Sequence, residues 1–179
     1  MAAVGARGKT ILKNAAMEPE VVCLAEFLNS RGAKITGAGT SEIIVEGSEL
    51  KENGKIFPVI PDRIEAGSFL ILGALAADNL KITDCQPVHL DSLIETMRFS
   101  GVMVEVGDDW LAVENNGKVA NEKRRAVNIK TEKYPGFPTD LQAPMAVLLT
   151  QVSGESLVNE TIFEGRLNYT ADLNRMGAD

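Results

Sequence analysis

The stretch IPDRIEAGSFLILGALAADNLKITD, residues 60–84, contains the pattern that decides the fold prediction. Residues 64–78 are apolar on nearly every side of a helix, and such a helix belongs in the interior of a protein. A short strand pattern follows it directly. Residues 141–153 (LQAPMAVLLTQVS) form a second helix of the same kind, again ahead of a strand. Buried helices next to strands predict a mixed α/β fold (α+β) with helices at the centre and sheets outside.

Outward from this stretch, one pattern occurs three times: a short strand, a polar turn, a helix and a closing glycine. The closing glycines suit the left-handed position that follows a helix. Successive glycines are 69 and 76 residues apart, so the repeating unit, β-α-β-β-α or close to it, is about 70 residues long. The predicted strands are 10–14, 80–84 and 157–161, the helices are 19–31, 87–100 and 170–176, and the glycines are Gly32, Gly101 and Gly177.

Further strands are predicted between these elements. An alternating pair joined by a Gly-containing turn follows each of the first two glycines, as a hairpin requires. A single strand then leads into each apolar helix. The hairpin strands are 34–36 with 42–46 and 103–106 with 110–114, and the single strands are 56–60 and 127–130.

Both ends of the chain cut through the repeat. Residues 1–7 have the pattern of the tail of another apolar helix. Only Ala178 and Asp179 follow the third glycine, where a hairpin should begin. We therefore expect residues 1–179 to form a single partial domain of roughly two and a half repeats, truncated at both ends, with no second domain.

The composition limits the class of partner. A chain of 179 residues with 45% apolar residues can build a core. Its net charge of −7 argues against a nucleic acid or an anionic membrane, because both require a basic face. No run approaches the roughly 18 apolar residues of a membrane span. The basic cluster at 123–125 ends a polar stretch, 115–125, that is typical of a solvated hairpin loop.

The cysteines and the histidine predict no metal site. Cys23 and Cys85 belong to no CxxC or Cys/His pattern, so two reduced thiols in a cytoplasmic protein is the simplest interpretation. The single histidine, His89, lies at a predicted helix start and is interpreted as a surface residue. Residues 1–8 lack the charged region and apolar core of a signal peptide.

Both apolar helices begin with residues that suit a capping box. At the first start Asp62 takes the N-cap and Glu65 the third helical position, and at the second Thr139 and Gln142 take these roles. Capping explains Asp62 without any further function. Asp140 differs, because Thr139 already supplies the cap, and the helix dipole stabilises a first-turn carboxylate by only about 0.3–1 kcal/mol. Asp140 is therefore a candidate general base, with a structural dipole partner as the alternative.

Five runs of the sequence, in chain order, are distinctive: NAAMEPE at 14–20, IPDRIEAG at 60–67, FPTDLQA at 137–143, TIFEGR at 161–166 and RMGA at 175–178. Together they resemble the UDP-N-acetylglucosamine 1-carboxyvinyltransferase family over essentially the whole chain. Five collinear runs are more specific than any single motif. The resemblance implies an inside-out α/β barrel in two lobes, each of three repeats, with a ligand cleft between the lobes. This chain resembles an internal piece of such an enzyme.

The resemblance also implies an activity and a set of site residues. The family transfers enolpyruvyl from phosphoenolpyruvate to the 3′-hydroxyl of UDP-N-acetylglucosamine and releases phosphate, the first committed step of peptidoglycan synthesis. Asp140 matches the aspartate that contacts this hydroxyl as general base. Ile162 matches a residue whose backbone contacts the nucleotide sugar, and Arg166 an arginine near the reacting centre. The other cleft residues implied by the resemblance are Glu18, Asp62 and Arg63. No cofactor and no metal are implied.

Part of this chemistry has no counterpart in the chain. Protonating phosphoenolpyruvate and neutralising its phosphate and carboxylate require a general acid and several cations. In the family these come from a flexible Cys or Asp loop and from a Lys-Asn pair near the N-terminus, and neither Cys23 nor Cys85 matches that loop. We therefore expect the chain to be inactive alone and to need the missing lobe as its partner. Met17 and Gly165 stand where the family usually has Arg and Asn.

Two other interpretations stay open. A 3-phosphoshikimate enolpyruvyl transferase, or more remotely an RNA 3′-phosphate cyclase, would share the fold. The runs around Asp62 and Asp140 count against the first, and the acidic charge counts against the second. A non-catalytic binding module built from repeats, in which the acids serve only as caps, would also explain the spacing, because a fold does not determine a function.

Overall fold

The computed structural model describes residues 1–114 and 124–178. The chain forms two compact units, unit 1 at Met1–Ile60 and unit 2 at Pro61–Asp179, and each is described by itself. The loop predicted at 115–125 includes residues 115–123, which lie outside the described residues. At its described end the prediction of a solvated basic cluster was wrong for Arg124, which is buried. The expectation of a single partial domain over 1–179 stays a prediction.

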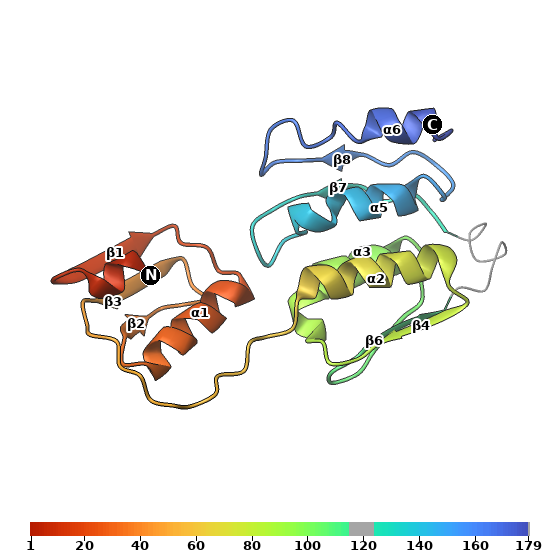
Figure 1. Cartoon of the computed structure of the whole chain (residues 1–179). Coiled ribbons are helices and arrows are strands. Elements are labelled where there is room, and N and C mark those ends of the chain that lie inside the picture. Colours follow the sequence, from red (N-terminus) through yellow and green to blue (C-terminus); the bar gives the residue numbers. More distant parts are fainter. Residues whose placement is uncertain (115–123, 179) are drawn as a thin grey trace. The chain divides into compact units, whose positions relative to one another are not determined.

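Unit 1 is a three-stranded antiparallel sheet with one helix (Figure 1). The strands lie in the order β1-β3-β2, with Lys13 opposite Glu42 and Thr36 opposite Ile44. A small core of Val4, Leu28, Ala33, Ile43 and Val45 joins the helix to the sheet. The elements are η1 (Ala2–Gly5), β1 (Lys9–Lys13), α1 (Pro19–Ser30), β2 (Lys34–Thr36) and β3 (Glu42–Glu46).

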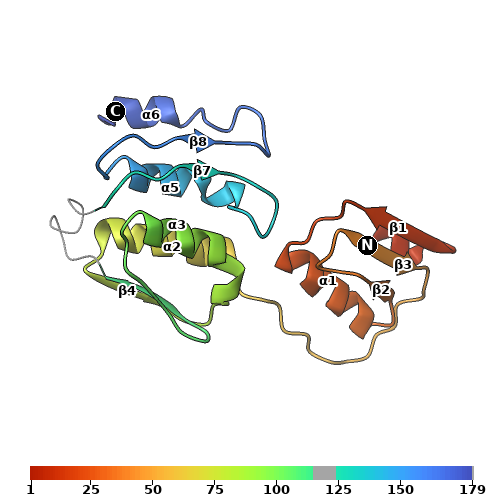
Figure 2. The same ribbon diagram turned by 180° about the vertical axis from the view of Figure 1, so that it is seen from behind.

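Unit 2 contains the two apolar helices and two sheets (Figures 1 and 2). One sheet is antiparallel in the order β4-β6-β5, and the other is the parallel pair β7-β8. Helix α2 packs on the first sheet and also against α5. The elements are α2 (Arg63–Ala76), β4 (Asn79–Ile82), η2 (Pro87–Leu90), α3 (Asp91–Phe99), β5 (Val104–Val106), β6 (Leu111–Glu114), β7 (Ile129–Lys130), η3 (Thr139–Leu141), α5 (Gln142–Leu149), β8 (Val158–Asn159) and α6 (Thr170–Arg175).

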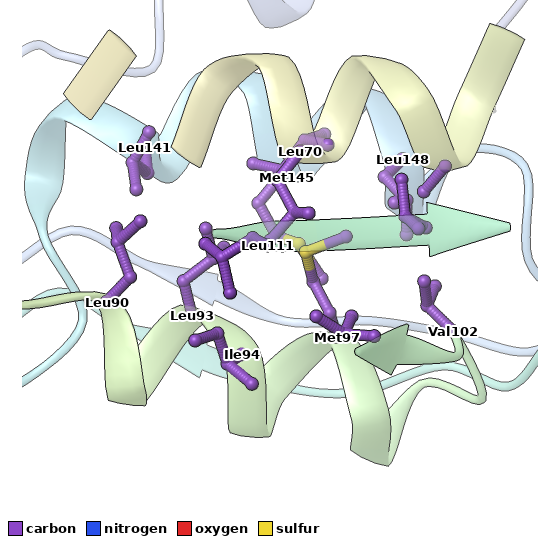
Figure 3. Close-up of a cluster of buried hydrophobic side chains, with 14 of the residues drawn as sticks. Leu70, Leu90, Leu93, Ile94, Met97, Val102, Leu111, Leu141, Met145 and Leu148 are labelled. Carbon is purple, nitrogen blue, oxygen red and sulfur yellow. The ribbon is translucent and has the colours of Figure 1, made fainter. Parts of the chain in front are cut away.

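The core of unit 2 lies where α2, α3 and α5 meet the sheet. Figure 3 shows their side chains pointing toward one another around Leu111 of β6. This arrangement confirms the prediction of buried apolar helices in a mixed α/β fold. The side chains with no exposed surface include Leu70, Leu93, Met97, Leu111, Leu141, Met145 and Leu148.

The predicted repeat is visible in the backbone. The polar residues that follow β1 and β4, Asn14 and Asp84, both have a left-handed φ, of 53° and 56°. Asn and Asp tolerate this region because their short side chains hydrogen-bond locally. The closing glycines Gly32, Gly101 and Gly177 have φ values of 98°, 95° and 97°. All three therefore occupy the left-handed position that the sequence predicted.

Three predicted elements were wrong. Residues 56–60 form no strand, since Pro58 lacks the amide that a ladder requires and Ile56 is 97% exposed with nothing to pack against. Residues 1–7 contain the short 3₁₀ helix η1 instead of the tail of an α-helix. The helix predicted at 141–153 is η3 followed by α5, so it begins in 3₁₀ geometry and ends earlier.

We expect Leu70→Ala to lower the free energy of unfolding by about 2–5 kcal/mol, because it leaves a cavity in a fully buried site. Leu72→Ala, on the side of α2 where Leu72 is 51% exposed, is the matched control and should cost about 0.5 kcal/mol or less. Urea denaturation of the parent and both variants measures this. Equal losses would contradict the buried side assigned to α2.

Candidate functional site

The start of α2 has the predicted cap. Asp62 Oδ1 accepts hydrogen bonds from the amides of Ile64, at 2.8 Å, and Glu65, at 3.1 Å. The carboxylate thus satisfies two amides that the first helical turn leaves without partners. The Arg63 guanidinium carbon lies 5.5 Å from the centre of the Tyr134 ring, in a cation–π contact. Both residues have a structural explanation at this helix start.

The start of α5 does not have the predicted cap. Pro138 occupies the N-cap position before η3, with no side-chain cap. The Thr139 hydroxyl donates instead to Glu160 Oε2 at 2.7 Å. Gln142 also turns to tertiary partners, accepting from the Tyr169 hydroxyl at 2.7 Å. The capping prediction was wrong because Glu160 and Tyr169 come from a later segment, and a local motif carries no information about such partners.

Asp140 and Arg166 form an ion pair across this helix start. Arg166 Nη2 donates to Asp140 Oδ1 at 2.6 Å, and Arg166 Nη1 donates to Thr139 Oγ1 at 2.9 Å. The Arg166 guanidinium carbon also lies 5.2 Å from the centre of the Phe163 ring. The side chains of Asp140 and Arg166 are 54% and 36% exposed, so the pair contributes only about 0–1 kcal/mol to stability. Asp140 therefore faces solvent and not the packed interior.

Glu160 is the residue that joins this cluster, and no pattern in the sequence indicated it. It lies just after β8 and is partly buried. A glutamate in a loop has no distinctive local signal, since only the fold brings its partners together. Its carboxylate accepts from the hydroxyls of Thr131 (2.9 Å) and Thr139 (2.7 Å), the amides of Ile162 (2.8 Å) and Phe163 (3.1 Å), and Gln142 Nε2 (3.5 Å).

These donors set the protonation of Glu160. Burial by itself would raise the pKa of the carboxyl, because it disfavours the charged form. The hydrogen bonds from Thr139, from the Ile162 and Phe163 amides and from Thr131 outweigh burial and lower the pKa below its ordinary value of 4.5. Burial, and then the Glu160 charge, raise the pKa of Tyr169. Glu160 is consequently an acceptor-only carboxylate at neutral pH.

Ile162 and Arg166 line an open pocket of about 680 Å³ formed by residues 160–168, 170 and 171. The Ile162 amide already donates to Glu160 at 2.8 Å. A ligand contact through the Ile162 backbone would therefore use its carbonyl. The structure brings together Asp140, Ile162 and Arg166, in one cluster around Glu160.

Glu18 belongs to unit 1 and is described by itself. It occupies the N-cap position of α1, where its carbonyl accepts from the Val21 amide at 2.9 Å. Its side chain makes no capping bond. Within the described residues, Glu18 Oε2 is fully covered and has no hydrogen-bond partner. The fold therefore covers this oxygen, although Glu18 stands at a helix start.

The described residues contain neither a membrane-spanning helix nor a cluster of metal ligands. There, no helix is both long and apolar enough to cross a membrane. Nor does any group of three or more His, Cys, Asp and Glu side chains in residues 1–114 and 124–178 have the arrangement to hold a metal ion. Cys23 and Cys85 are buried free thiols, and burial raises the pKa of Cys85.

Comparison with known proteins gives one consistent family. The model of the EPSP synthase (3-phosphoshikimate 1-carboxyvinyltransferase) family matches residues 1–179. Three relatives are named UDP-N-acetylglucosamine 1-carboxyvinyltransferase. Those of Acidobacterium capsulatum and Solibacter usitatus are each 47% identical over the whole chain, and that of Escherichia coli is 42% identical over 99% of it. The chain spans 40–42% of the length of these curated relatives.

Solved structures show the same fold. The enolpyruvyl transferase NikO from Streptomyces tendae matches 96% of this chain with a TM-score of 0.81 at 24% identity, over 40% of its own length. EPSP synthase from Acinetobacter baumannii matches 98% of this chain with a TM-score of 0.50 at 16% identity, over 43% of its own length. The predicted enolpyruvyl transferase type of fold is thereby confirmed.

The lowered pKa of Glu160 predicts a stability loss in acid. The folded pKa lies below the unfolded one, so the unfolded chain binds the proton first as the pH falls. The contribution of Glu160 is complete above about pH 4.5 and is lost as the pH falls through the folded pKa. We expect urea midpoints of parent and Glu160→Gln to differ by a constant amount above pH 4.5 and to converge below it.

Glu155→Gln is the control, because Glu155 is an exposed glutamate of unit 2. Its midpoint should follow the parent throughout. A gap between parent and Glu160→Gln that stayed constant or widened in acid would show that the hydrogen bonds to Glu160 do not favour its ionised form.

Proposed function

This chain belongs to the EPSP synthase (3-phosphoshikimate 1-carboxyvinyltransferase) family, and from that premise we propose that it forms part of a UDP-N-acetylglucosamine 1-carboxyvinyltransferase. The proposed enzyme transfers enolpyruvyl from phosphoenolpyruvate to the 3′-hydroxyl of UDP-N-acetylglucosamine and releases phosphate, in peptidoglycan synthesis. The names of relatives at 42–47% identity support the sugar nucleotide over shikimate 3-phosphate as acceptor. A cytoplasmic setting is part of the proposal, in line with two unpaired thiols.

The ion pair between Asp140 and Arg166 is the observation that carries the mechanism. Arg166 occupies only Oδ1 of Asp140, at 2.6 Å. The Asp140 side chain is 54% exposed, so its carboxylate is accessible to the proton of a substrate hydroxyl. A capping role would instead engage the carboxylate with backbone amides, as at Asp62. The arrangement favours a catalytic Asp140 over a purely structural one.

The chemistry requires a base at this position. As the sugar oxygen bonds to C2 of phosphoenolpyruvate, Asp140 takes its proton, and a positioned base contributes roughly 10²–10⁴-fold. Arg166 holds Asp140 in one orientation through the 2.6 Å contact and adds a positive charge beside the reacting groups. The proton that goes to the methylene carbon, and further cations for the phosphate and the carboxylate, come in this proposal from the rest of the enzyme.

The remaining residues have supporting roles in the proposal. Ile162 contacts the sugar nucleotide through its carbonyl, since its amide is used by Glu160. Glu18 of unit 1 is proposed as a substrate-binding residue because the run at 14–20 resembles the family. Asp62 and Arg63 contribute at the start of α2, where Asp62 acts first as the cap.

We expect the chain alone to bind UDP-N-acetylglucosamine weakly, in the millimolar range of about −4 kcal/mol, and to release no phosphate from phosphoenolpyruvate. Titration of the ¹⁵N-labelled chain should shift the amide signals of Asp140, Ile162 and Arg166. Shikimate 3-phosphate, at equal concentration, is the control and should leave them in place. Shifts caused by shikimate 3-phosphate alone would favour the shikimate enzyme. Phosphate release would contradict the inference that the chain alone lacks groups needed for the reaction.

The base is tested in a chimera in which residues 1–179 replace the matching segment of the Acidobacterium capsulatum relative. We expect Asp140→Asn to lower kcat by about 10²–10⁴-fold with little change in KM for the sugar nucleotide. Asp172→Asn is the matched control, because Asp172 also pairs with an arginine, Arg175, but on an exposed helix face. An unchanged kcat in Asp140→Asn would remove Asp140 from this role.

A further inference from the structure

Glu160 accepts hydrogen bonds from five donors, and its two oxygens divide them. Oε1 accepts from the Thr131 hydroxyl and from the amides of Ile162 and Phe163. Oε2 accepts from the Thr139 hydroxyl and, at the longer distance of 3.5 Å, from Gln142 Nε2. One oxygen thus holds the loop after β8, and the other holds the start of α5.

Position 160 has to be an ionised carboxylate. The Tyr169 hydroxyl donates to Gln142 Oε1 at 2.7 Å, and Gln142 Nε2 faces Glu160 Oε2 at 3.5 Å. A glutamine at 160 would place its NH₂ group against these donors or against the backbone amides. Either orientation sets donor against donor, and buried donors without acceptors are costly.

The charge at Glu160 decides the direction of the Thr139 hydroxyl. A hydroxyl has one proton, and the Thr139 proton goes to Glu160 Oε2 at 2.7 Å. The lone pairs of Thr139 Oγ1 are then left to accept from Arg166 Nη1 at 2.9 Å. Arginine can only donate, so a Thr139 hydroxyl turned the other way would lose this bond. Hydrogen bonds therefore connect Glu160 to Asp140: Thr139 donates to Glu160, and Arg166 donates both to Thr139 and to Asp140.

This chain of bonds is attached to the packed body of unit 2. Thr131, which donates to Glu160, has 0% exposure, and Gln142 has 1%. Thr131 Oγ1 also accepts, at 2.8 Å, from the amide of Thr161, the residue that follows Glu160. At the other end, Asp140 is exposed and Arg166 is partly exposed. The buried end supplies the rigidity that two exposed side chains lack, which is how supporting contacts position a site.

We propose that Glu160 is a positioning residue that, through the Thr139 hydroxyl, fixes the Arg166 guanidinium against Asp140. Its importance for catalysis rests on the proposed function, whereas the positioning itself can be measured in the chain without substrate. Glu160 touches neither reacting group. It acts by keeping Arg166 Nη2 on Oδ1 of Asp140.

The positioning is tested by NMR on the ¹⁵N-labelled chain. A guanidinium held by Thr139 and Asp140 rotates slowly, so Arg166 should show separate Nη signals. We expect Glu160→Gln to merge these signals, because the Thr139 hydroxyl loses its acceptor. The amides of Ile162 and Phe163 should keep their protection from exchange, since the glutamine oxygen can still accept from them. Glu155→Gln is the control and should match the parent.

Variants of Thr139 test whether Glu160 positions Arg166 through the Thr139 hydroxyl or only holds the loop after β8. Thr139→Ser keeps the hydroxyl and should preserve the Arg166 signals, whereas Thr139→Val should merge them. The double variant Glu160→Gln/Thr139→Val should resemble Thr139→Val alone, because both changes act through one hydroxyl. Parent-like Arg166 signals in Glu160→Gln would overturn the proposal. Merged Arg166 signals accompanied by loss of protection at the Ile162 and Phe163 amides would overturn it as well, because the loop as a whole would then have loosened. Should Glu160→Gln not fold, Thr139→Val with parent-like Arg166 signals would overturn it.

Kinetics in the chimera give an independent readout. We expect Glu160→Gln to lower kcat by about 10-fold or more with KM for the sugar nucleotide nearly unchanged, because misplacing a group by about 1 Å can cost 10²-fold. A rise in KM alone would contradict the role of Glu160. A chimera without activity, in which Arg166 still responds to Glu160→Gln, would sink the proposed function and leave the positioning intact.

Discussion

Close approach between helix α2 and its neighbours is the constraint on which unit 2 depends. A Cβ at Gly67 would come within 2.6 Å of Leu141 Cδ1, and one at Gly73 within 2.7 Å of Leu80 and Val113. Glycine at both places lets η3 and the sheet pack directly on the helix backbone. Since η3 is held there, the start of α5 lies next to the first turns of α2, and the candidate site forms at that end.

A single carboxylate then organises the surface above this packing. Glu160 draws together the end of β7, the start of α5 and the loop after β8, through donors that each come from a different part of the chain. Opposite charges that are exposed normally contribute little and move freely. The ion pair of Asp140 and Arg166 acquires a defined geometry because Thr139 connects it to Glu160. In this network Glu160 and Thr139 hold the geometry, whereas Asp140 and Arg166 are the residues proposed to act on the substrate.

The contacts of Asp62 and Asp140 bear on whether this chain is a binding module or part of an enzyme. A binding module whose acids serve only as caps fits Asp62, whose carboxylate caps α2. It does not fit Asp140, because Pro138 stands at the N-cap and Asp140 binds an arginine instead of backbone amides. The chain spans 40–42% of its curated relatives, so the activity proposed for it is one of a larger protein.

The sequence by itself determined the elements whose signals are local. Apolar residues around α2 predicted a buried helix, and the glycines after the three repeat helices predicted left-handed turns, because periodicity and backbone freedom are properties of short segments. The run FPTDLQA also singled out Asp140. Only the tertiary structure decided what Thr139 and Gln142 contact, and it alone revealed Glu160, since the partners of Thr139 and Gln142 lie 18–27 residues away in sequence. The cap at Thr139 was predicted from neighbours along the chain. In the structure its hydroxyl bonds instead to the Glu160 carboxylate, which the fold brings close.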